Sequence, residues 1–108
     1  MKWDETRIKQ AFVNMKKEGW DTSKPLKWGF TFMDTEKDKL LDIYNELKTH
    51  DYSLESLIFK ENLNLWLLYV VKKEVLTKGK LHRRNLSFED LVDYYEIECY
   101  DGWDAQKI

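Results

Sequence analysis

Few side chains in this sequence are of the types that carry out chemistry, and their spacing does not favour it. The two histidines, His50 and His82, each lack a second histidine or a cysteine pair at metal-ligand spacing, which argues against a zinc site. The single cysteine, Cys99, lies in a short apolar stretch that predicts a buried small hydrophobe. Phosphate-binding glycine loops and the Gly-x-Ser-x-Gly motif are absent. The sequence therefore predicts no enzyme, no metal site and no cofactor.

Charged side chains, in contrast, are segregated along the second half of the chain. Residues 72–84 hold six basic side chains and one acid, Glu74, whereas residues 85–104 hold seven acids and neither lysine nor arginine. With a net charge of only −2, the whole chain has no general attraction for nucleic acid or an acidic membrane. Any electrostatic binding must therefore come from these local clusters.

The acidic cluster is a candidate partner-binding surface. Glu89, Asp93 and Glu96 follow a spacing of i, i+4 and i+7, on the side of a predicted helix away from its apolar residues. Like charges at this spacing cost an isolated helix a few tenths of a kcal/mol, and a basic partner would offset that cost. Asp101 and Trp103 extend the candidate set beyond the helix. The alternative, an ordinary solvated helix face, stays open.

The basic cluster offers a second candidate, contact with phosphate. Its members are Lys72, Lys73, Lys80, Arg83 and Arg84. RNA-binding domains of a related architecture stack bases on aromatic side chains within a glycine- and lysine-containing signature. The sequence lacks that signature around its central aromatic residues, so core packing explains them better. Direct binding of nucleic acid is accordingly a minor alternative, and the basic residues could simply balance the acidic helix.

The longest apolar run, Leu63–Val71, is the element around which the rest must pack. It is far shorter than the roughly 20 residues that cross a bilayer, and it predicts a strand with both faces covered. Pleating places Leu65, Leu67 and Tyr69 on one face and alternate residues, including Leu68, on the other.

The remaining elements are read from periodicity and turn residues. A helix is expected over residues 3–18, with Gly19 ending it, followed by a strand over Leu26–Met33. Next we expect a helix that begins with a capping box from Thr35 to Asp38 and ends near His50, and a strand over Tyr52–Lys60 that forms a hairpin with the central run. A second long helix is expected over Leu81–Tyr95, restarting at a capping box from Ser87 to Asp90. A short strand over Ile97–Tyr100 follows it.

This order predicts an α+β fold, a ferredoxin-like split βαβ arrangement (β-α-β-β-α-β) with an antiparallel sheet and an additional N-terminal helix. Residues 1–25 form the N-terminal helix and linker, packed on the domain, and residues 26–108 form the ferredoxin-like domain itself. Two crossover helices cover one face of the sheet. Either the N-terminal helix or a second copy in a homodimer covers the other.

Composition sets the expected compartment. The chain of 108 residues is 43% hydrophobic and 15% aromatic, enough for one domain with a real core. One cysteine excludes an internal disulfide framework, and the N-terminus carries no apolar signal segment. We therefore expect a cytoplasmic protein without a membrane segment.

Two stretches resemble a known family. The ending Tyr-Glu-Ile-Glu-Cys-Tyr-Asp-Gly-Trp-Asp (residues 95–104), preceded by Asn-Leu-Ser-Phe (85–88), resembles the close of the regulator of ribonuclease E activity B family. The stretch Trp-Gly-Phe-Thr-Phe (28–32), leading into Asp34, is similar to that family's first strand and helix. The resemblance covers residues 26–104.

The resemblance implies a ferredoxin-like domain without catalytic residues that binds a ribonuclease and tunes messenger-RNA decay by protein–protein contact. It offers no catalytic motif and names no partner for this particular chain. Two alternatives remain: an immunity or antitoxin-type protein that binds a cationic toxin, and an RNA-binding domain.

Overall fold

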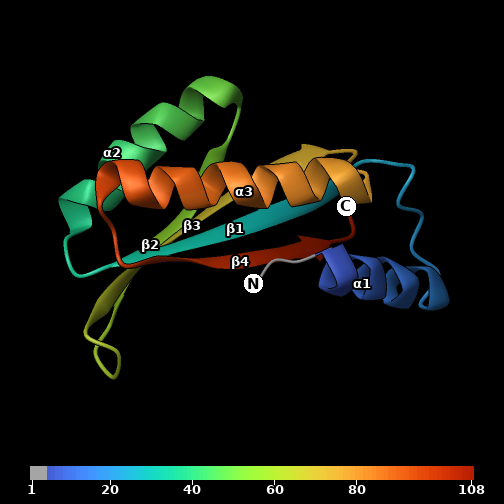
Figure 1. Cartoon of the computed structure of the whole chain (residues 1–108), viewed down its shortest axis with the longest axis horizontal. Coiled ribbons are helices and arrows are strands. Elements are labelled where there is room, and N and C mark those ends of the chain that lie inside the picture. Colours follow the sequence, from blue (N-terminus) through green and yellow to red (C-terminus); the bar gives the residue numbers. More distant parts are fainter. Residues whose placement is uncertain (1–4) are drawn as a thin grey trace.

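The computed structural model describes residues 5–108 and shows three helices, a short 3-10 turn and four strands (Figure 1). The expected helix start near Trp3 lies outside the described residues. In chain order the elements are α1 (Glu5–Lys17), β1 (Leu26–Asp34), α2 (Lys37–Leu47), the 3-10 turn η1 (Lys48–His50), β2 (Ser53–Lys60), β3 (Leu65–Glu74), α3 (Lys78–Tyr95) and β4 (Cys99–Gln106).

The predicted α+β class with an antiparallel sheet is confirmed. The strands lie in the order β2-β3-β1-β4, and every neighbouring pair is antiparallel. β3 therefore lies between β1 and β2, as a split βαβ unit requires. The expected hairpin of β2 and β3 is also present, and it leaves β2 and β4 as the two edge strands.

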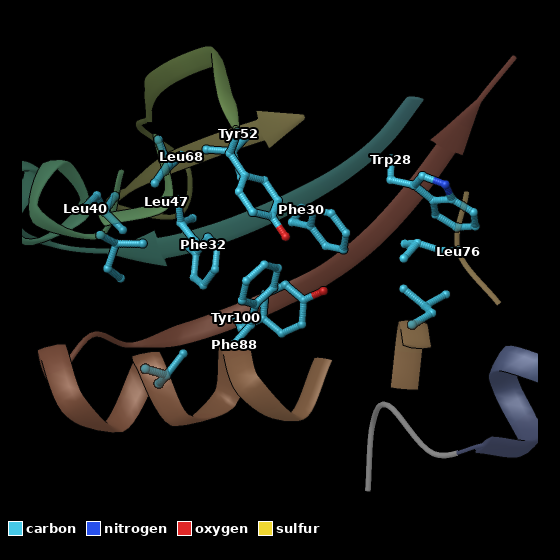
Figure 2. Close-up of a cluster of buried hydrophobic side chains, with 14 of the residues drawn as sticks. Trp28, Phe30, Phe32, Leu40, Leu47, Tyr52, Leu68, Leu76, Phe88 and Tyr100 are labelled. Carbon is cyan, nitrogen blue, oxygen red and sulfur yellow. The ribbon is translucent and has the colours of Figure 1, made fainter. Parts of the chain in front are cut away.

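Helices α2 and α3 cover one face of the sheet, and the core lies between them and β1. Alternate residues of β1, Trp28, Phe30 and Phe32, are fully buried on this face. Phe88 of α3 inserts among the aromatic rings of the sheet, with its ring centroid 5.0 Å from that of Phe30 and 5.4 Å from that of Tyr100 (Figure 2). Edge-to-face aromatic contacts of this kind add to the stabilisation by burial, so α3 is fixed along the sheet.

Three helical segments end in the left-handed conformation. Gly19 has φ +83°, and the amide of Trp20 donates to the carbonyl of Met15, which is a Schellman motif. Gly19 thus ends α1, as the sequence predicts. Asp51 after η1 and Glu96 after α3 adopt the same conformation without being glycine. Because a side chain costs about 1 kcal/mol in this region, packing at these two ends overrides a local preference.

The expectation that the N-terminal helix covers the far face of the sheet is wrong. Phe12 of α1 stacks on Trp28 at 6.1 Å, and Trp28 belongs to the face that α2 and α3 cover. Buried Ile8 and Met15 join the same core, and α1 contacts α3 (Figure 1). The apolar stripe of α1 is therefore satisfied beside the beginning of α3, where it extends the helical layer.

The expectation of a central strand covered on both faces is also wrong. Leu63 and Asn64 belong to the hairpin turn, with Asn64 in the left-handed region, and β3 begins at Leu65. Leu68 is fully buried under the helices, whereas Leu67 on the opposite face is only half-buried. No helix of residues 5–108 covers that second face. Apolar side chains of neighbouring strands shield one another there instead.

The last strand is longer than the sequence indicates. The strand expected over Ile97–Tyr100 instead runs from Cys99 to Gln106, so Asp101 and Trp103 lie inside β4. The register against β1 shifts between Thr31 and Phe32, so Asp101 is an extra residue, and Gly102 has φ +109°. Gly102 therefore permits a β-bulge and not a terminal turn.

Neither expected capping box forms. The residue before α2 is Glu36, whose side chain makes no capping bond; buried Asp34 instead accepts hydrogen bonds from the amides of Glu36 (2.8 Å) and Glu98 (2.9 Å). α3 is continuous through Ser87 and begins after Thr77, whose hydroxyl accepts from the amide of Lys80 at 3.2 Å. Asp34 thereby joins the ends of β1, α2 and α3 in place of a local cap.

Candidate protein-binding surfaces and an interhelical cleft

The acidic residues predicted to bind a partner lie at the end of α3. Glu89 and Asp93 stand one turn apart on α3, and Glu96 is the left-handed residue that follows it. Asp93 and Glu96 are exposed, whereas Glu89 is half-buried. We call Glu89, Asp93 and Glu96 the acidic flank. Asp93 makes no ion pair with any side chain of residues 5–108.

The two remaining residues of that predicted set have different surroundings. Asp101 is exposed at the bulge of β4. Trp103 is half-buried, and its ring lies 5.6 Å from Trp28, tilted against it. Trp103 therefore packs on the core and anchors β4, so its indole offers a partner only its exposed edge.

The structure divides the predicted basic cluster among separate surfaces. Lys72 and Arg84 face the cleft between α2 and α3. Lys73 is exposed and directly opposite Lys27, near the end of the sheet. The side chains of Lys80 and Arg83 are exposed on α3. Lys72 and Lys73 also line one hollow beside Lys27, so the cluster is divided between that region and α3.

The cleft between α2 and α3 brings charged and apolar side chains from several elements together. Its volume is about 380 Å³. It is lined by Glu46, Leu47, His50, Tyr52, Lys72, Arg84, Ser87, Phe88 and Leu91. Of these residues, the sequence analysis named only Lys72 and Arg84 as candidate site residues, for contact with phosphate. The cleft itself could not be predicted, because its residues come from segments that meet only when α2 and α3 lie side by side on the sheet.

Two cations flank one aromatic ring in this cleft. The ammonium of Lys72 lies 5.1 Å from the Tyr52 ring centroid, and the guanidinium of Arg84 lies 5.7 Å from it. Burial raises the pKa of Tyr52 to about 12, and the charge of Arg84 opposes that rise. Arg84 is held by Glu74 through two hydrogen bonds of 2.6 and 2.9 Å. Bidentate pairing of this kind fixes the guanidinium in place.

A third surface, which sequence reasoning did not single out, runs along β2 and the hairpin. Ile58, Phe59 and Leu63 are exposed at 43%, 42% and 51%. The ring centroids of Phe59 and Trp66 lie 5.4 Å apart, and the ammonium of Lys37 lies 5.0 Å from the centroid of the Trp66 ring. β2 is an edge strand, so its outer backbone groups are unpaired as well. The signal available in the sequence was the apolar Leu57-Ile58-Phe59 run.

The side chains considered for metal or nucleophilic chemistry are the two histidines and Cys99. Within residues 5–108, no three His, Cys, Asp or Glu side chains are arranged to hold a metal ion. His82 lies 3.7 Å from Glu5 of α1, and Cys99 is half-buried at the start of β4. The helices of this part of the chain also include none long and apolar enough to span a membrane.

Fold and surfaces together define a small α+β domain that presents both charged and apolar surfaces. The chain belongs to the family described as regulator of ribonuclease activity B, whose model matches residues 4–105. The match includes α1, ahead of the stretches that carry the resemblance in the sequence. A search of curated proteins found no match.

Proposed function

We propose that this protein regulates a ribonuclease by binding it, without catalysing a reaction itself, and that the acidic flank supplies the contact. The family is one of ribonuclease regulators, and the resemblance in the sequence suggests ribonuclease E as the partner and the cytoplasm as the compartment. One observation carries the choice of surface. Asp93 and Glu96 are exposed next to each other at the end of α3, in a stretch of seven acids without a basic residue.

The chemistry of this surface favours a basic partner segment. Carboxylates clustered on one side of a helix end raise the local concentration of a cationic segment and set its register. RNA-processing enzymes carry arginine-rich segments that bind RNA, and such a segment would meet the acidic flank directly. A cationic toxin would meet it equally well, so the antitoxin alternative shares the surface and differs in the partner.

The experiment is a titration of the purified chain with ribonuclease E from the same organism at about 50 mM salt, where surface charges are weakly screened. Asp93→Lys combined with Glu96→Lys should weaken binding at least about tenfold. The control is Glu18→Lys with Glu61→Lys, which changes net charge equally at two exposed sites away from α3.

The control variant should bind within about threefold of the natural chain. Equal weakening by both variants would reduce the effect to net charge, and unchanged affinity in the Asp93/Glu96 variant would remove the acidic flank from the mechanism. If the natural chain does not bind the ribonuclease but co-purifies with a cationic toxin, the antitoxin alternative holds.

Direct RNA binding has less support. The basic residues are divided between β3 (Lys72, Lys73) and α3 (Lys80, Arg83, Arg84), and Arg84 is already paired with Glu74. A gel-shift at about 50 mM salt tests this alternative, since phosphate contacts lose affinity steeply as salt rises. A salt-sensitive complex that disappears in Arg83→Ala would support it.

A further inference from the structure

We propose that the cleft between α2 and α3 binds a small organic oxyanion, a phosphate or carboxylate carried on an apolar or aromatic group, with Lys72 as its charge partner. This site is separate from the proposed contact with a ribonuclease. The cleft lies on the side of α3 that carries Ser87 and Leu91. Glu89 comes two residues after Ser87, and Asp93 comes two residues after Leu91. Two residues correspond to roughly 200° around a helix, so these acids lie on the side of α3 away from the cleft.

Lys72 has an unusual position for a lysine. It stands directly opposite Trp28, on the covered face of the sheet. The two residues before it on that face, Val70 and Leu68, are fully buried. Lysine is rarely placed on such a face without a partner, because an ammonium loses hydration there. Its stem is half-buried, and its ammonium lies over the Tyr52 ring.

Glu46 is the acid that lines the cleft, and Glu74 pairs with one of the two cations there. Glu74 gives both of its carboxylate oxygens to Arg84. Glu46 accepts a hydrogen bond from the hydroxyl of Tyr95 at 2.9 Å. Lys72 itself makes no ion pair with any residue from 5 to 108. The Lys72 ammonium is therefore available to pair with an anion that enters the cleft, although the Glu46 carboxylate shares the same lining.

The rest of the lining indicates what carries the anionic group. Leu47, Phe88 and Leu91 make an apolar wall, while Ser87 and His50 add polar groups. A volume of about 380 Å³ lies at the lower end of the range for small-molecule sites, about 300–1,000 Å³. A single ring or short alkyl group with one oxyanion is the chemical class that matches both walls.

The test is an NMR titration of the purified full chain, following backbone amides, with four probes: phenyl phosphate, benzoate, inorganic phosphate and benzyl alcohol. We expect saturable shifts at His50, Ser87 and Leu91 with phenyl phosphate or benzoate. Whichever of these two probes binds with the lower Kd identifies the preferred oxyanion. Inorganic phosphate should bind more weakly because it leaves the apolar wall empty, and benzyl alcohol should give no saturable shift because it has no charge.

Lys72→Met should weaken binding at least about tenfold while keeping the stem that packs on Tyr52. Lys73→Met is the matched control, since it removes the same charge from the next residue on the opposite face, and it should change affinity by less than about twofold. Thermal unfolding confirms that both variants are folded. The proposal is overturned if no probe saturates, if the shifts lie outside the cleft, or if the two variants weaken binding equally.

Discussion

The hydroxyl of Tyr69 in β3 donates a hydrogen bond of 2.6 Å to the carboxylate of Asp104 in β4, although β1 lies between these two strands. The Tyr69 side chain passes over Gly29 of β1. A Cβ built at Gly29 would collide with the phenol oxygen and ring carbons of Tyr69. Gly29 is therefore required by a close approach on the uncovered face of the sheet, where it allows three strands to be linked by one side chain.

Gly29→Ala should destabilise the fold by about 1–3 kcal/mol, because the new methyl group displaces the Tyr69 ring and breaks its bond to Asp104. Urea unfolding followed by circular dichroism measures the loss. Gly79→Ala is the control: at that position in the first turn of α3, a Cβ meets only Arg83, at 3.6 Å. It should leave stability unchanged or raise it by up to about 1 kcal/mol. Equal losses in both variants would contradict the role assigned to Gly29.

Stability should fall as the solution becomes alkaline. Burial raises the pKa of Tyr52 to about 12 and raises the pKa of Tyr100 strongly. In the unfolded chain both phenols lose their protons near pH 10. Above that pH the folded state holds more protons than the unfolded state, so the free energy of unfolding decreases with pH; below about pH 10 the contribution is complete.

The free energy of unfolding should fall less steeply with pH in Tyr100→Phe, because one titrating group is removed. The slope should be smaller by about 1.4 kcal/mol per pH unit between pH 10 and the pKa of Tyr100 in the folded state. The variant is also less stable at every pH, because buried Asn85 loses the hydroxyl that donates to it at 2.6 Å. The slope is therefore the informative quantity. Phe88→Leu serves as a comparison that weakens the same core without removing a hydroxyl, and it should leave the slope unchanged.

The ion pair between Glu74 and Arg84 should contribute more to stability than the pair between Lys27 and Glu55. Its side chains are 17% and 21% exposed, and both carboxylate oxygens are used. Glu74→Ala leaves the guanidinium without its partner beside Tyr52 and should cost about 2–4 kcal/mol. Glu55→Ala breaks the more exposed pair with Lys27 and should cost less than about 1 kcal/mol. Thermal unfolding at matched salt separates the two, and a larger loss in Glu55→Ala would contradict this ranking.

We expect the chain to form a homodimer through the β2 edge. Exposed apolar residues on an unpaired edge strand promote strand-to-strand association. Ile58→Lys should abolish concentration-dependent self-association in sedimentation velocity, because a lysine on the edge disfavours pairing. Val13→Lys, which removes a comparably exposed apolar residue from α1, should leave it intact. A natural chain that stays monomeric at every concentration contradicts this expectation.

Local patterns were sufficient for most of the elements. The alternation of Leu26–Met33 predicted β1, and Gly19 predicted the end of α1, because both depend on residues close in the chain. The order of the elements predicted the antiparallel arrangement, and the resemblance at residues 28–32 and 95–104 predicted the family. The cleft could not be predicted from the sequence, because Ser87 of α3 and His50 of η1 come close to Lys72 of β3 only in the folded chain.

By itself, then, the sequence determined the elements, their order and the separation of acidic from basic side chains, because periodicity and charge are local properties of the chain. Only the tertiary structure decided which surfaces exist. It placed α1 beside α3 instead of on the far face, turned Lys72 inward beside Tyr52, and drew Asp101 into a bulge. Those outcomes depend on which apolar surfaces bury one another across the sheet, and segments far apart in the sequence make that choice together.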